Sequence, residues 1–78
     1  MPTAERIDWM LAMLNAADVG SLESIGAKIR QVQEELEARG EADLGKVAAE
    51  ARAALGRGDV VEFRRGRAFL QSKIGHLR

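Results

Sequence analysis

Several kinds of functional site are excluded by residues that this 78-residue chain lacks. It has no cysteine, which rules out disulfides and thiolate chemistry. Its only histidine, His76, leaves too few ligands for an ordinary zinc site. Tyrosine is absent, and no glycine-rich loop followed by a lysine is present. We therefore expect a protein that is not an enzyme, with no catalytic residue, metal or cofactor.

Prolines, aromatic side chains and long apolar runs are also scarce. One proline and 4% aromatic residues, in a chain rich in alanine, leucine, glutamate and arginine, favour α-helices. The longest N-terminal apolar run, Trp9 to Leu14, follows two acidic residues and is too short to span a bilayer. We expect a soluble, cytoplasmic protein that does not bind membranes.

The charges balance over the whole chain but not within it. There are 12 basic and 12 acidic side chains, so the chain as a whole has no electrostatic bias toward nucleic acid or an anionic surface. Residues 1–56 carry a net charge of −4 and residues 57–78 a net charge of +4. This split makes the C-terminal segment the only candidate for phosphate binding.

The chain length predicts one domain, 1–78, of marginal stability. Domains of this size usually gain stability from disulfides, metals, oligomerisation or very good helix packing. With no cysteine and a single histidine, oligomerisation or very good helix packing remains, and we favour a homo-oligomer, with a dimer as the preferred form.

The segment from Ser21 to Gly40 carries the clearest structural pattern, and Ser21 is its predicted N-cap. Its apolar residues recur at steps of three and four, which places them on one narrow stripe of a helix over 21–39. Glu35 and Arg39 have the spacing of an ion pair within that helix. The stripe consists of Leu22, Ile25, Ile29, Val32 and Leu36.

Similar stripes predict three more helices, over 3–17, 43–55 and 59–77, with Thr3, Asp43 and Asp59 as N-caps. Short connections between them favour antiparallel neighbours. The fold class is therefore all-α, a compact four-helix bundle of two antiparallel hairpins. The alternative is three long helices with a fragmented fourth. The stripes contain Ile7, Met10, Leu11, Leu14 and Ala17; Leu44, Val47, Ala48, Ala51 and Leu55; and Val60, Phe63, Gly66, Leu70, Ile74 and Leu77.

A shift of 38 residues aligns much of the second stripe with the fourth, Leu22 meeting Val60, but the match fails where Ile29 meets Arg67. Any two amphipathic hairpins of similar length align in this way. We favour that explanation over a duplication.

Apolar residues outside the stripes point to association. Trp9 and Met13 flank the first stripe and Phe69 flanks the fourth, so the chain has more apolar surface than one core needs. Cover by the last helix is an alternative for Trp9 and Met13. We predict a small non-enzymatic protein–protein interaction module that uses Trp9, Met13 and Phe69 and binds itself or another protein.

The basic C-terminal segment supports an alternative function, a regulator that binds nucleic acid. Against it, the cations spread around the helix, and no nucleic-acid-binding motif is recognisable. Pairing with acidic side chains of the first two helices is the interpretation we favour. The candidate phosphate contacts are Arg57, Arg64, Arg65, Arg67 and Lys73.

Overall fold

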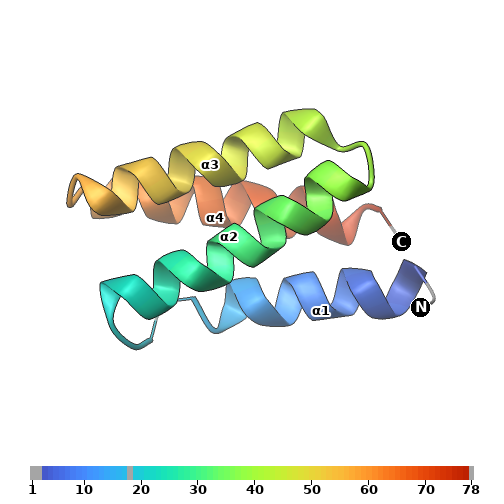
Figure 1. The fold of residues 1–78 in the computed structure, drawn as a ribbon, viewed down its shortest axis with the longest axis horizontal. Coiled ribbons are helices and arrows are strands. Elements are labelled where there is room, and N and C mark those ends of the chain that lie inside the picture. The colour runs from blue at the N-terminus through green and yellow to red at the C-terminus, as the bar shows by residue number, and fades with distance from the viewer. Residues whose placement is uncertain (1–2, 18, 78) are drawn as a thin grey trace.

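The computed structural model describes residues 3–17 and 19–77, without the Thr3 side chain, and forms an antiparallel bundle of four helices. They are α1 (Thr3–Asn15), α2 (Leu22–Ala38), α3 (Ala42–Gly56) and α4 (Val60–Gly75). The α1–α2 and α3–α4 connections lie at one end, and the α2–α3 turn lies at the other (Figure 1). The predicted all-α bundle is confirmed. Since α4 is one continuous helix, the alternative with a fragmented fourth helix is wrong.

The helices follow one another around the bundle, so α1 borders α2 and α4, and α3 borders the same two helices from the other side. The backbone of α3 lies closer to its neighbours than that of α1 does. Small residues allow this approach. Ala48, Ala51 and Ala54 are buried, and a Cβ built on Gly66 of α4 would lie 3.1 Å from the Ala51 Cβ.

Most residues of the predicted stripes form the core, together with Ala54. Ile29 and Leu36 of α2 are fully buried, together with residues of α1 and α4 at equivalent depth. Burying side chains of this size contributes about 1.5–3 kcal/mol each, which makes the stripes the main source of stability. The fully buried large side chains are Ile7, Met10, Leu14, Ile29, Val32, Leu36, Leu70 and Ile74.

The helix ends lie within two residues of the predicted ones. Ser21 and Asp59 are the N-caps of α2 and α4, as predicted. The predicted cap at Asp43 is wrong, because α3 starts at Ala42 after the N-cap residue Glu41, which makes no side-chain cap bond. Asp43 instead lies in the first turn, where its charge suits the helix dipole. The Thr3 cap falls outside the described side chains.

A backbone motif at the end of α2 explains why α3 starts where it does. Gly40 adopts the left-handed conformation with φ 79°. Its N–H donates to the Glu37 carbonyl at 3.1 Å, and the Glu41 N–H donates to the Leu36 carbonyl at 2.8 Å. These two bonds form a Schellman motif, which ends α2 and reverses the chain. Gly58 ends α3 in the same way.

Candidate functional site

Exposed large apolar side chains gather at one end of the bundle. Five such residues are exposed among those that the structure describes, and four of them, Val19, Leu22, Val60 and Val61, belong to the end with the α1–α2 and α3–α4 connections (Figure 1). Their exposed fractions range from 47% for Val60 to 68% for Val61. We call these four residues the apolar end. Exposed apolar side chains at one end of a small domain are a candidate interaction site.

Two members of the apolar end were predicted to lie in the core, and that prediction is wrong. Leu22 is 66% exposed and Val60 is 47% exposed, although both have the angular position of a core residue. Each is the first residue of its helix, so it projects past the layer formed by the next stripe residue, Ile25 or Phe63. Helical periodicity fixes the direction of a side chain around the axis, but it does not fix whether a neighbouring helix reaches that far.

The same local chemistry positions both residues. Gly20 and Gly58 adopt left-handed conformations with φ 103° and 77°, and each is followed by a capping residue. The side-chain oxygens of Ser21 and Asp59 each accept a hydrogen bond of 3.1 Å from the backbone N–H three residues further on. Both helix starts are therefore fixed by backbone geometry and a cap.

An open groove of about 870 Å³ begins at Leu22 and runs between α2 and α3. Its apolar lining is mostly small, and its charged lining includes Glu23, Arg30 and Arg52. Arg52 donates a hydrogen bond of 2.9 Å to the Gln33 side chain. Glu23 and Arg30 make no ion pair with the residues that the structure describes. The apolar lining includes Leu22, Gly26, Ala27, Ala49, Ala53 and Gly56.

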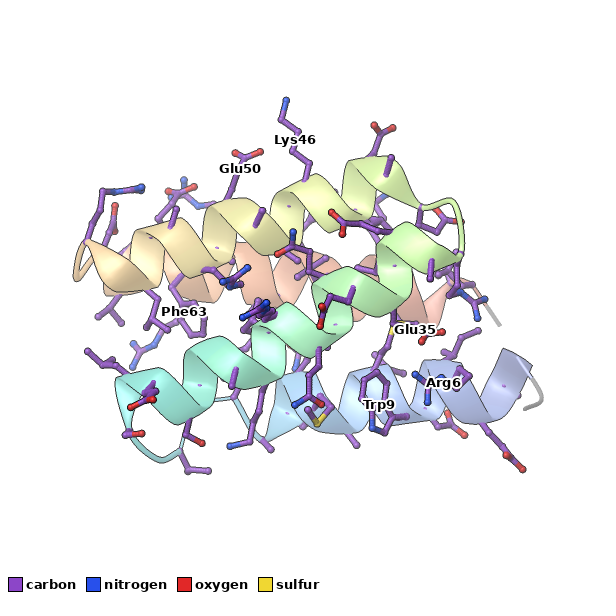
Figure 2. All side chains as sticks on the ribbon, viewed as in Figure 1. Arg6, Trp9, Glu35, Lys46, Glu50 and Phe63 are labelled. Atoms are coloured by element: carbon purple, nitrogen blue, oxygen red, sulfur yellow. The ribbon has the colours of Figure 1, made fainter. Side chains whose placement is uncertain are left out.

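Trp9 and Met13 are half-buried and pack against the core. The Arg6 guanidinium lies over the Trp9 ring, 4.3 Å from its centroid, and reaches Glu35 on α2 (Figure 2). Met13 lies one helical turn beyond Trp9 on the same side of α1. The Trp9 flank of α1 therefore faces α2 and not the last helix, which corrects the alternative that the last helix covers it.

Phe69 lies on a different side of the molecule. It is 45% exposed, and it follows Gly66, which packs against Ala51 of α3, by one turn of α4. The Lys73 ammonium lies 5.6 Å from the Phe69 ring centroid and partly covers the ring. Since α1 does not border α3, the structure does not join Phe69 to Trp9 and Met13 in one surface. Their role in association stays a prediction.

Arg6 and Glu35 form an ion pair between α1 and α2. The predicted pair of Glu35 with Arg39 is not the one that forms, because Arg6 reaches the carboxylate from the neighbouring helix. The hydrogen bond from Arg6 lowers the pKa of Glu35 and outweighs the opposing effect of partial burial. The same hydrogen bond raises the pKa of Arg6. The pair therefore ties α1 to α2 over the Trp9 ring.

The predicted phosphate contacts do not share one face. Arg64 and Lys73 are nine residues apart, which places them on opposite sides of α4. Arg65 donates a hydrogen bond of 3.1 Å to Glu62 of its own helix. Arg67 is half-buried with its Nε out of contact with solvent, and Arg57 lies in the α3–α4 connection. The favoured pairing with acidic residues of α1 and α2 is not seen for Arg65, whose partner is local.

The sequence interpretation missed the apolar end as a site. The signal was present in the order of the residues, since Leu22 and Val60 each come directly after a predicted cap. A residue at that position begins the helix and lies at its tip. Counting positions from the cap, in addition to the period of the stripe, would have separated these two residues from the core.

The described residues contain no group of three or more histidine, cysteine, aspartate or glutamate side chains arranged to hold a metal ion. None of the helices in residues 3–17 and 19–77 is long and apolar enough to cross a membrane. Comparison of the chain with protein-family models, curated proteins and solved structures found no match.

Proposed function

We propose that this protein is a small, non-enzymatic protein–protein interaction module that binds through the apolar end. The observation that carries the proposal is that Val19, Leu22, Val60 and Val61, four of the five exposed large apolar side chains among the described residues, all lie at one end of the bundle. Removing apolar surface from water contributes roughly 25 cal/mol per Å², so covering four exposed side chains would favour association. The proposal includes a cytoplasmic location, since a chain without cysteine needs no oxidising compartment.

The apolar end supports binding better than the surfaces around Trp9 and Phe69 do. Trp9 is covered in part by Arg6 within the monomer, and Phe69 by Lys73. The four residues of the apolar end are 47–68% exposed, and Leu22 and Val60 lie at the starts of two capped helices. We do not extend the proposal to nucleic acid, because the cations of α4 point in several directions.

The test compares a variant of the apolar end with a matched variant elsewhere. Leu22→Ser together with Val61→Ser removes two side chains that are 66% and 68% exposed, so the monomer should stay folded. Phe69→Ser is the control, since it also removes an exposed large apolar group. Circular dichroism verifies folding, sedimentation equilibrium measures self-association, and affinity capture from the host cell followed by binding measurements with the purified partner measures hetero-association.

We expect the double variant to lose association and Phe69→Ser to keep it. The proposal fails if the double variant binds the same partner with unchanged affinity. It also fails if the wild-type chain neither self-associates nor binds another protein. If association is lost only in Phe69→Ser, the binding site is the surface around Phe69 that was predicted from the sequence.

A further inference from the structure

Gly26 is a glycine within α2 that the monomer does not require. A Cβ built on it meets nothing within 4 Å, whereas one built on Gly45 would lie 2.9 Å from the Glu37 side chain and one on Gly66 would lie 3.1 Å from Ala51. Glycine inside a helix lowers stability relative to alanine. Close packing within the bundle thus explains why positions 45 and 66 are glycine. It does not explain why position 26 is glycine.

Gly26 lies in the α2–α3 groove between two charges of opposite sign. Glu23 precedes it by three residues and Arg30 follows it by four, and both line the groove. Neither side chain has an ion-pair partner among the described residues. Along α2 the groove therefore offers one acid and one base, about 10 Å apart, to a molecule that docks there, while Arg52 on the α3 side is held by its hydrogen bond to Gln33.

A second α2 in antiparallel orientation satisfies both charges. If a two-fold axis passes between Gly26 and Ala27, residue 23 of one copy lies opposite residue 30 of the other. Any helix face can be paired with itself in this way, but here the residue types also fit. Glu23 of each copy lies opposite Arg30 of the other, which gives two ion pairs. Gly26 and Ala27, the smallest residues of the face, lie at the crossing, where the helix axes approach most closely.

We propose that the α2–α3 groove is the interface of a homodimer in which the two α2 helices cross antiparallel at Gly26 and Ala27. The proposal deepens the proposed function, and rests on it, because Leu22 belongs both to the apolar end and to the groove. A standard interface covers about 800 Å² on each partner. This is roughly one sixth of the accessible surface of 4709 Å², so the dimer would bury part of the apolar end beside the groove.

Charge reversal tests the symmetry directly. In Glu23→Arg, each dimer would contain two arginine–arginine contacts, and in Arg30→Glu, two glutamate–glutamate contacts. Each single variant should dimerise roughly tenfold more weakly than wild type at low ionic strength. Mixing the two variants restores both opposite-charge pairs, and so does the double variant. Sedimentation equilibrium gives the dimer affinities, and circular dichroism verifies that each variant is folded.

Gly26→Ala provides a second readout that does not depend on charge. It should raise the thermal midpoint of the monomer, since alanine favours the helix and the site has space. It should also weaken the dimer, because the added methyl groups separate the axes at the crossing. A merely structural role for Gly26 would not produce these opposite changes.

Several outcomes overturn the dimer, and they are distinguishable from failure of the proposed function. If the wild-type chain stays monomeric at all concentrations, the dimer proposal fails. The proposed function would still hold if the monomer binds another protein through Leu22 and Val61. A dimer that is weakened by Leu22→Ser with Val61→Ser but unaffected by either charge reversal places the interface at the apolar end alone. The dimer proposal also fails if the chain is monomeric and Gly26→Ala weakens its binding to a helix of another protein.

Discussion

Gly66 in α4 and Gly26 in α2 are both interior residues of a helix, and they stand in opposite surroundings. Gly66 faces Ala51 across the α3–α4 seam at near-contact distance, whereas Gly26 faces an open groove. The sequence alone does not distinguish the two positions, because it shows only that a side chain is missing at each. The structure shows that one of the two gaps is filled within the monomer, and that the other remains open on the surface.

The largest expected difference in stability is between a substitution on the buried face of α2 and one on its exposed face. Ile29→Asp places an unpaired charge at a fully buried position, which should cost on the order of 4 kcal/mol or more. A domain of this size has little more stability than that, so the variant should be unfolded. Gln31→Asp, two residues further on and exposed in the groove, should keep the native helical circular dichroism signal. A folded Ile29→Asp variant would contradict the assignment of this face to the core.

Substitutions of Gly66 and Gly26 should differ by an intermediate amount in their effect on stability. Gly66→Val forces a branched side chain against Ala51, and such overpacking should lower the free energy of unfolding by about 1–3 kcal/mol. The same change at Gly26 has open space around it and should alter the stability by less than about 0.5 kcal/mol. Urea denaturation of both variants measures the difference. Equal losses at the two positions would show that the seam is not tighter than the groove.

The smallest expected effect concerns the pair that joins α1 to α2. Because Arg6 lowers the pKa of Glu35, the ionised carboxylate stabilises the fold at neutral pH. This contribution is lost as the pH falls below the ordinary value of about 4.3 and through the lower pKa of the folded state. Glu35→Gln should therefore lower the thermal midpoint slightly at pH 7 and leave it nearly unchanged at low pH. A loss that is independent of pH would mean that packing over Trp9, and not the charge, is responsible.

Most of the fold could be predicted from the sequence, because each helix combines a clear period with a clear beginning and end. The stripe through Ile29 and Leu36 and the caps at Ser21 and Asp59 are local features that neighbouring residues determine. Asp43 was misassigned because the preceding Schellman turn already fixes where α3 begins. A turn of this kind depends on the φ angle of Gly40 and competes with a side-chain cap.

The candidate site could be predicted only in part. Phe69 was correctly placed outside the core, and Trp9 was correctly placed beside it. The exposure of Leu22 and Val60 could not be read from their angular positions, because exposure also depends on how far the neighbouring helices extend. The same limit applies to the Arg6–Glu35 pair, since its two members are 29 residues apart and meet only through the packing of α1 on α2.

The capped starts of α2 and α4 have a consequence for the entropy of binding. Leu22 and Val60 are exposed, yet each follows a residue whose side chain is hydrogen-bonded to the first turn of the helix. Exposed apolar groups on unstructured loops lose backbone freedom when a partner covers them, and this loss weakens the complex. Here the backbone is already ordered in the free protein. Leu22, Val60 and Val61 are therefore preorganised, and a partner that covers them would need to restrict only side-chain rotation.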